Sequence, residues 1–429
     1  MNKISVIIMS LMLAASASAA NNIAVKLEGV FDFQAAVRNQ KNLGSDKKLT
    51  HNQNNAGLYS QSALRVRVTN ETEEGMEYGA VFGIRTTSKT KVFGGDNGSY
   101  LFVQNDFGRL EAGSRQDAAS ILSQHAYVIA VATGDDWMRY FKFAPKIYSG
   151  HSAYNIVGSD YSYVYGGTFD SKLENSPEAP RAVTYYTPKL IGFQAGVTYT
   201  PDASNVGDGV ISNSNGSNPV VLFDKTNGYN QVNANVSVKN MISAAITYEH
   251  NVAEDIDIAL GFGITQGKTK VTGGTMTVPP VAPATDATKQ PVSVKLANYK
   301  TYNVGAIVSY GNWSAAASYA DEGKSFTAAQ YFFDNKRSTK SYTAGVAYNQ
   351  GPMGVSLTFL KSDKYKNKQS SYTLGTQYKI APGLMPYFEV TAVQFKGRGY
   401  DMWTTPGTPV SVRRNTSGVV CLFGTKVSL

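Results

Sequence analysis

The sequence predicts an all-β protein, a 16-stranded antiparallel transmembrane β-barrel. Apolar and polar residues alternate in many segments, as they do in strands with one apolar face and one wet face. Short and long connections between these segments also alternate, which is typical of barrels with tight turns at one end and longer loops at the other. No internal apolar run approaches the roughly 18 residues of a membrane-spanning helix.

The composition fits a barrel better than a soluble domain or a helical membrane protein. Charged residues make up 17% of the chain, below the roughly 25% of ordinary soluble domains, yet the mean hydropathy is only −0.23. A barrel exposes only alternate residues to lipid and is therefore polar on average. The net charge is +9, but Lys and Arg are spread along many segments, so we expect no binding to nucleic acid. The single cysteine, Cys421, excludes an intrachain disulfide.

The first 20 residues have the pattern of an export signal. Lys3 supplies the positive start, residues 4–14 are apolar, and a run of Ala and Ser offers cleavage sites ending at Ala17, Ala19 or Ala20. An uncleaved transmembrane anchor is the alternative, but the small residues favour cleavage. We therefore predict a signal peptide at residues 1–20 and one barrel domain at residues 21–429.

The alternation begins directly after this signal and holds for sixteen residues, from residue 23 to residue 38. The apolar face consists of Ile23, Val25, Leu27, Gly29, Phe31, Phe33, Ala35 and Val37. The other face carries charged and amide groups. A tilted strand crosses a bilayer with roughly 9–11 residues, so this segment is long enough. A membrane strand after an export signal indicates a barrel in the bacterial outer membrane.

The same pattern predicts sixteen strands in total. They cover residues 23–38, 62–70, 76–86, 99–105, 109–115, 181–187, 193–200, 230–250, 256–266, 298–310, 313–320, 341–349, 354–361, 371–379, 386–395 and 418–429. Residues 230–250 are assigned to one strand, because their apolar residues keep one parity with Asn240 as the only exception. A turn at residues 239–240 would give seventeen strands. An even number is the rule for bacterial single-chain barrels and places both chain ends on the inner side of the membrane.

The sequence gives little support for enzyme chemistry. The histidines His51, His125, His151 and His250 lie in unrelated segments without metal-ligand spacing. The patterns G-x-S-x-G, H-E-x-x-H and the P-loop are absent. We predict no enzymatic activity, no cofactor and no metal site.

Four segments, taken together, resemble the trimeric general porins of Gram-negative outer membranes. Residues 62–84 resemble the second and third porin strands with their acidic turn, and residues 99–116 and 181–199 resemble the hairpins on either side of the constriction loop. Residues 419–429 are similar to the C-terminal assembly strand of the family. Two features differ: the chain ends in Leu429 where the family usually has Phe, and Tyr100 and Tyr186 stand where family members often carry arginine.

The resemblance implies that the long loop at residues 116–180 folds into the barrel as a constriction loop and narrows the pore. A loop of this length is in itself an indication of function. The candidate tip is at residues 132–137, where Asp135 and Asp136 follow Gly134, which can adopt the backbone conformations of a tight inward turn. We expect these two carboxylates to form the acidic side of the constriction. A solvated loop tip is the alternative, and Asp160, Asp170 and Glu174 are other acidic candidates in the loop.

A basic wall is expected opposite this acidic side. By parity the lumen-facing cations are Lys26, Arg38, Arg65, Arg67, Arg85, Arg109 and Arg115. A charge on the lipid face would cost roughly 2–4 kcal/mol near the midplane, so these side chains are expected to point inward. Arg65 resembles a family pore arginine in its local sequence. Alternatively these residues only line water and stabilise the sheet through pairs with Glu77 or Glu111.

The resemblance implies a channel for passive diffusion of small hydrophilic solutes and ions. It also implies that the protein is a homotrimer in contact with outer-membrane lipid and lipopolysaccharide. The excess of basic residues predicts a mild preference for anions. A sugar-specific porin is one alternative, although most Tyr and Phe have outward parity. A phosphate-specific porin is another and could use Arg139, Lys142 and Lys146. A third alternative is a barrel that serves mainly as an adhesin or receptor.

Overall fold

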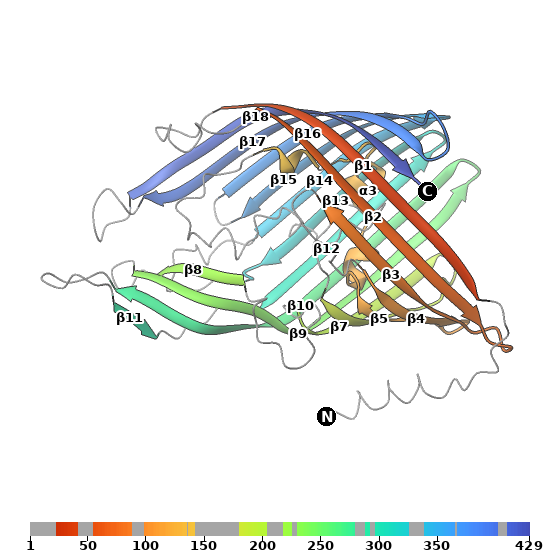
Figure 1. Ribbon diagram of the computed structural model, residues 1–429, viewed down its shortest axis with the longest axis horizontal. Coiled ribbons are helices and arrows are strands. Elements are labelled where there is room, and N and C mark those ends of the chain that lie inside the picture. The colour runs from red at the N-terminus through yellow and green to blue at the C-terminus, as the bar shows by residue number, and fades with distance from the viewer. Residues whose placement is uncertain are drawn as a thin grey trace, which may run out of the picture.

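The computed structural model is an antiparallel β-barrel (Figure 1). It describes residues 23–41, 55–87, 98–134, 136–141, 180–203, 218–224, 230–278, 288–291, 297–325, 339–364, 367–401 and 410–429. The strands of the first half are β1 (Ala24–Gln40), β2 (Ala56–Glu71), β3 (Glu77–Thr87), β4 (Tyr100–Asn105), β5 (Gly108–Ser114), β6 (Arg181–Tyr186), β7 (Phe193–Asp202), β8 (Asn218–Asp224) and β9 (Asn230–Ala253). Those of the second half are β10 (Ile256–Val278), β11 (Thr288–Pro291), β12 (Tyr299–Tyr310), β13 (Trp313–Gly323), β14 (Thr339–Gln350), β15 (Met353–Lys364), β16 (Asn367–Tyr378), β17 (Leu384–Asp401) and β18 (Val410–Ser428).

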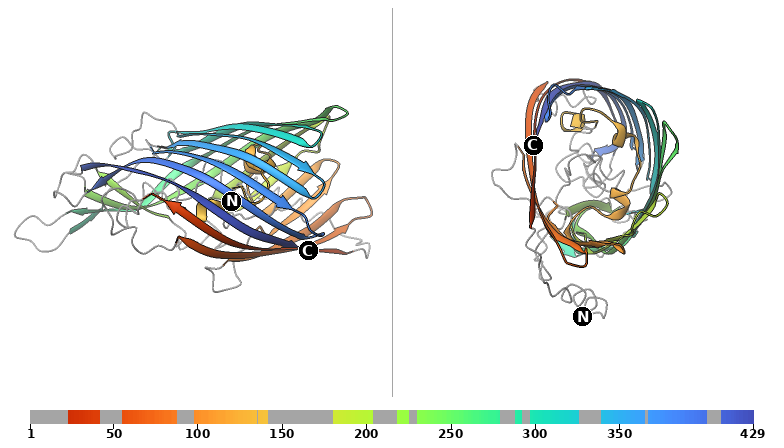
Figure 2. Two further views of the ribbon diagram at one scale, coloured as in Figure 1. Left: turned by 90° about the horizontal axis from the view of Figure 1, so that it is seen from above. Right: turned by 90° about the vertical axis from the view of Figure 1, so that its right-hand side faces the viewer.

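The barrel closes because β1 pairs with both β2 and β18, the last strand of the chain. Strand β7 pairs directly with β9, and β10 pairs directly with β12. The short strands β8 and β11 only extend β9 and β10 at one end. Sixteen of the 18 strands in the described sheet therefore form the closed wall, as the ring in Figure 2 shows. The predicted fold class and all sixteen predicted strands are confirmed.

The two ends of the barrel differ in their connections. Two-residue turns join β12 to β13 and β14 to β15, and they lie at the same end as the start of β1 and the end of β18. We call this the short-turn end. At the opposite end the strands are longer than predicted, since β10 continues to Val278 and β17 to Asp401.

Strand β9 is continuous, as predicted, but the parity predicted across Asn240 is wrong. The register against β10 shifts between Gln266 and Lys268, and Asn240 has a positive φ of 49°. An extra residue on one strand is a β-bulge, which turns the following side chains to the other face. Ile242 is accordingly 45% exposed on the outer face, whereas Val238 pairs with Thr269, which has the parity of the buried Thr265.

The outer face of the wall is apolar and the inner face is polar. On β1, Leu27, Phe31 and Phe33 are 44–56% exposed, while Asp32 and Gln34 are at most 1% exposed. The predicted alternation is thus confirmed for this strand. Aromatic pairs lie near the short-turn end, with ring centroids 4.8 Å apart for Trp313 and Tyr348 and 4.5 Å apart for Phe193 and Tyr248. Aromatic side chains in this position are typical of the belts at a membrane interface.

The described helices all lie in the loop that follows β5. They are α2 (Ala118–Ile121), α3 (Ala126–Ile129) and the 3₁₀ helix η2 (Asp136–Arg139). Figure 2 shows this part of the loop inside the ring of strands. None of the helices in the described part of the chain is long and apolar enough to cross a membrane.

Candidate functional site

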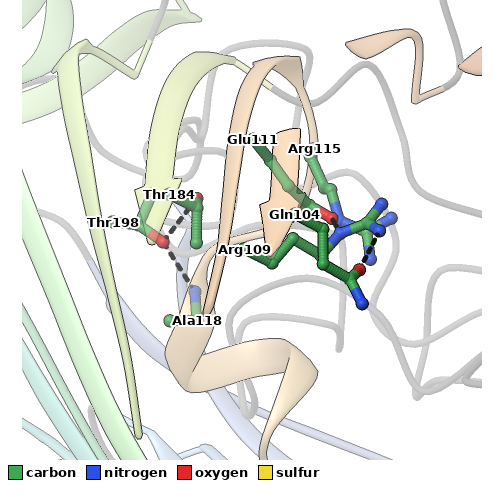
Figure 3. Close-up of polar contacts among 7 residues, drawn as sticks. All are labelled: Gln104, Arg109, Glu111, Arg115, Ala118, Thr184 and Thr198. Carbon is green, nitrogen blue, oxygen red and sulfur yellow. Dashed lines mark hydrogen bonds and ion pairs between the residues drawn. The ribbon is translucent and has the colours of Figure 1, made fainter. Parts of the chain in front are cut away.

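The loop follows the inner wall around the barrel. Helix α2 contacts β7, β9 and β10, helix α3 contacts β13, β14 and β15, and η2 contacts β18. Side-chain hydroxyls of these strands accept hydrogen bonds from backbone N–H groups of the loop. The four donor–acceptor pairs are Ala118 to Thr198 (2.8 Å), Ala119 to Ser243 (3.1 Å), Ala126 to Thr343 (3.2 Å) and Val131 to Ser356 (3.0 Å). Figure 3 shows the first of these, with Thr184 hydrogen-bonded to Thr198. Buried backbone donors of the loop are thereby satisfied.

Wall glycines allow the loop to lie close to the strands. A Cβ atom on Gly261 would lie 2.9 Å from the carbonyl oxygen of Leu122, and one on Gly305 would collide with the carbonyl of Gln124. Elsewhere the loop packs on an apolar side chain of the wall. Leu360 of β15 has no exposed surface and packs with Tyr127 and Ala130 of the loop.

The loop tip is anchored by aromatic residues in an apolar part of the inner wall. Trp137 is fully buried and Phe141 is 4% exposed, with their ring centroids 6.3 Å apart. They pack against inward-facing residues of β1, β17 and β18, namely Ala36, Val393, Phe395, Val420 and Leu422. Aromatic side chains bury a large apolar area, so this contact holds the tip on the wall.

Polar contacts fix the backbone of the tip. Glu389 of β17, which has no exposed surface, accepts hydrogen bonds through Oε2 from Thr133 Oγ1 (2.7 Å), Thr133 N (3.3 Å) and Gly134 N (2.7 Å). Lys426 Nζ donates to the carbonyl oxygen of Ala132 (2.9 Å). Gly134 has a φ of 77°, a conformation that glycine adopts without strain.

Asp136 directs its carboxylate toward the wall of the barrel. It is 9% exposed and accepts a hydrogen bond from the side-chain amide of Gln34 on β1. The same amide nitrogen donates to Asp32 Oδ2 (3.0 Å), and Tyr387 donates to Asp32 Oδ1 (2.6 Å). Tyr140 of the loop donates to Gln34 Oε1 (3.1 Å). This network joins the loop to β1 and β17.

Five of the cations singled out from the sequence gather on the inner face of the first strands. Glu28 of β1 contacts Lys26 (2.6 Å between Nζ and Oε1) and Arg65 (3.6 Å between Nη1 and Oε2). Lys26 lies opposite Arg67 in the register of β1 and β2. On β5, Arg109 Nε donates to Glu111 Oε1 (2.6 Å), and Arg109 Nη1 donates to Gln104 Oε1 (2.8 Å).

Arg115 also pairs with Glu111, which is only 2% exposed (Figure 3). Its guanidinium lies 4.5 Å from the ring centroid of Tyr100, and that of Arg109 lies 4.0 Å from the ring centroid of Phe102. We call Lys26, Arg65, Arg67, Arg109 and Arg115, together with Glu28 and Glu111, the basic cluster. Its five cations and two carboxylates leave a net charge of +3. Stacking on aromatic rings holds the planar guanidinium groups in fixed positions.

The family-level comparison matches most of the chain. The family model for Gram-negative porins matches residues 6–398. The chain belongs to the Gram-negative porin family. The resemblance found in the sequence is thereby confirmed, and the protein is an outer-membrane porin channel.

Relatives and solved structures agree with this assignment. The porin is 33% identical to an uncharacterized protein of Rickettsia bellii (strain RML369-C) over 434 aligned residues, covering 94% of this chain and 92% of the relative. It is likewise 33% identical to the uncharacterized protein RP068 of Rickettsia prowazekii (strain Madrid E), with the same coverage of both chains. Among solved structures it is similar to the anion-selective porin from Comamonas acidovorans, with a TM-score of 0.54 and 17% identity over 95% of this chain and 100% of that chain. At this identity the last similarity concerns the fold alone.

The remaining predicted site residues are not part of the basic cluster. Arg38 lies farther along β1 and donates from Nη1 to the carbonyl oxygen of Tyr140 (2.9 Å). The backbone of Arg85 is part of β3, but its side chain lies outside the described residues. Other residues singled out from the sequence also lie outside the described part of the chain. They are Asp135, Asp160, Asp170, Glu174, Lys142, Lys146, His51, His151, residues 1–22 and the side chain of Arg139.

Several residues that hold the loop of the porin were missed in the sequence. They are Gln34, Tyr387, Glu389 and Lys426, which all face inward from β1, β17 and β18. Gln34 lay on the predicted polar face of the first strand, so its direction was evident but its partner was not. Glu389 stands between the outward Phe388 and Val390 in a membrane strand. A lone inward carboxylate of this kind indicates a contact inside the barrel and could have been used to predict one.

Two titratable side chains of the loop lie outside the membrane-spanning strands, the half-buried Asp117 and the buried His125. Asp117 accepts a hydrogen bond from the backbone N–H of Ser120 (2.9 Å) at the start of α2, and burial raises the pKa of its carboxyl group. Burial lowers the pKa of His125 to about 4, so its imidazole is neutral at pH 7. In the described part of the chain no three His, Cys, Asp or Glu side chains are placed to hold a metal ion.

Proposed function

We propose that this porin is a passive diffusion channel for small hydrophilic solutes and ions with a mild preference for anions. The net charge of the basic cluster carries this proposal. Its arginines are ion-paired and stacked on aromatic rings, so they present fixed positive charge to the lumen, and rows of fixed charge select which ions enter a channel.

The loop at residues 116–180 acts as the constriction loop in this proposal. Its described part is held against the inner wall by hydrogen bonds and by Trp137. It therefore occupies part of the lumen and reduces the free cross-section. Asp136, with Asp135, supplies the acidic side, although the contact with Gln34 turns the carboxylate of Asp136 toward β1.

Membership of the family supports a proposal for the setting of the channel. We infer a precursor whose residues 1–20 are cleaved on export and a homotrimer in the outer membrane, in contact with lipid and lipopolysaccharide. The short-turn end faces the periplasm, because bacterial barrels place their short turns there. The proposal includes no enzymatic activity and no cofactor.

Electrical recording of the purified porin in a planar bilayer tests the function. In a KCl gradient we expect stable conductance steps and a reversal potential of the sign that indicates chloride preference. Replacement of Arg67 and Arg109 together by Gln is expected to move the reversal potential toward zero, whereas Lys396→Gln, outside the basic cluster, leaves it unchanged. A reversal potential that indicates potassium preference in the wild type would refute the anion preference, and absence of conductance would refute the channel.

A further inference from the structure

A partly enclosed recess lies between the tip of the loop and the short-turn end of the inner wall. Its volume is about 340 Å³, within the range of small-molecule sites. Residues of β16, β18, β1 and β2 line it together with the loop residues Ala132, Thr133 and Asp136. A solute that has passed the loop tip therefore meets this recess before it leaves the barrel.

Two lysines and two carboxylates line the recess. They are Lys379, Lys426, Asp32 and Asp136, and the amides of Gln61 and Gln377 accompany them. Formal positive and negative charges are thus equal in number. The recess differs in this respect from the basic cluster, which carries excess positive charge.

Lys426 of the recess lies next to Asp32 without forming an ion pair with it. Asp32 and Lys426 are opposite each other in the β1–β18 register, yet neither Lys426 nor Lys379 forms an ion pair within the described part of the chain. Lys426 instead donates to the carbonyl oxygen of Ala132, which leaves other N–H groups of its ammonium for a ligand. Asp32 accepts hydrogen bonds from Tyr387 and Gln34.

Separated opposite charges of this kind match a ligand that carries both. A carboxylate placed between Lys379 and Lys426 would receive charge-assisted hydrogen bonds, and an ammonium beside Asp136 and Asp32 would be attracted by both carboxylates. A solute with only one charge would satisfy one half of the recess and would bring its charge close to like charges in the other half.

We propose that the recess binds small zwitterionic solutes that carry one ammonium and one carboxylate group, the size of an amino acid or dipeptide. The proposal rests on the proposed channel function, since the solute reaches the recess through the lumen. In this proposal the recess selects zwitterionic solutes at the short-turn end, whereas the basic cluster sets the preference of the channel for anions.

Ion-current recordings with three matched solutes test this proposal. They are alanylalanine, its N-acetyl derivative, which is an anion, and its C-terminal amide, which is a cation. We expect alanylalanine to reduce the current with a saturable dependence and a half-blocking concentration about tenfold lower than that of either derivative. Lys379→Gln and Lys426→Gln should each remove this advantage over the amide, and Asp136→Asn should remove the advantage over the N-acetyl derivative.

Lys396→Gln is the matched control, because Lys396 is exposed and does not line the recess. Lys379 is also exposed, so its replacement leaves folding intact even where Lys426→Gln does not. Equal block by the three solutes, or block that the variants leave unchanged, rejects the site while the channel stands. A protein that carries no ion current rejects both the channel and the site.

Discussion

Glu389 on β17 accepts two hydrogen bonds from Thr133, one from its hydroxyl group and one from its backbone N–H. Strand and loop are thus joined at the point where the loop turns, next to Asp136. A third hydrogen bond comes from the N–H of Gly134. This buried carboxylate therefore fixes the backbone of the loop tip, together with Lys426, which donates to Ala132, and the apolar contacts of Trp137.

Glu389→Ala is expected to loosen the loop tip. The N–H groups of Thr133 and Gly134 would lose their acceptor, which costs about 1–3 kcal/mol for each buried donor left unpaired. We predict larger current fluctuations in single-channel recordings and passage of larger solutes in liposome-swelling assays. Glu249→Ala is the control, because its side chain is 45% exposed at the short-turn end. Wild-type noise and size exclusion in Glu389→Ala would contradict the role of this carboxylate.

Glu111→Gln is expected to increase the preference for anions. The change removes one of two carboxylates in the basic cluster and leaves Arg109 and Arg115 without the negative charge that they share. The reversal potential in a KCl gradient should therefore move further toward the chloride potential. Glu73→Gln alters an exposed turn residue and should leave the reversal potential unchanged. A shift toward potassium in Glu111→Gln would show that Glu111 is needed to orient the arginines rather than to offset their charge.

His125 is expected to make the barrel less stable in mild acid. Its pKa in the folded porin is about 4, whereas an unfolded chain has a histidine pKa of about 6.5. Between these values the unfolded chain binds the proton and the folded one does not, so the free energy of unfolding falls as the pH is lowered through this window. Above pH 6.5 this contribution is constant. Thermal midpoints measured from pH 7 to pH 4 should fall less steeply in His125→Gln than in the wild type. Parallel pH profiles for the two proteins would contradict this prediction.

Gly305→Ala is expected to displace the loop from the wall. The added methyl group would collide with the backbone carbonyl of Gln124, and backbone cannot move aside as a flexible side chain can. Overpacking of this kind costs about 1–3 kcal/mol. We predict a lower thermal midpoint and altered conductance. In the control Gly29→Ala, the added methyl group is at an ordinary distance of 3.5 Å from Leu429 and should have little effect.

The wall could be predicted from the sequence because lipid and water impose a period of two on it. The alternation of Leu27, Phe31 and Phe33 with Asp32 and Gln34 is sufficient to assign both faces of β1. Asn240 was the exception, since a bulge changes parity without any Gly or Pro to mark it. The strand was predicted correctly there, and so was the outward face of Ile242 and Ile246, but the face of Val238 was not.

The path of the loop could not be predicted in the same way. It depends on contacts between segments that are distant in sequence, such as Trp137 with Val393 and Leu422. These wall residues are apolar and face inward, so they break the alternation on which the prediction relied. The apolar run at residues 418–423 was the available signal. A membrane strand that is apolar on both faces needs a cover on its inner side, and the loop provides it.

The attachment of the loop tip also determines the order in which the protein can fold. Gly134 and Glu389 are 255 positions apart in the sequence, and Ala132 and Lys426 are 294 positions apart. Contacts that close such long stretches of chain form late, because the entropy lost must be offset by structure already in place. The tip can take up its position only after the final two strands have joined the sheet. During assembly the barrel is therefore closed first, and the loop tip docks on its inner wall afterwards.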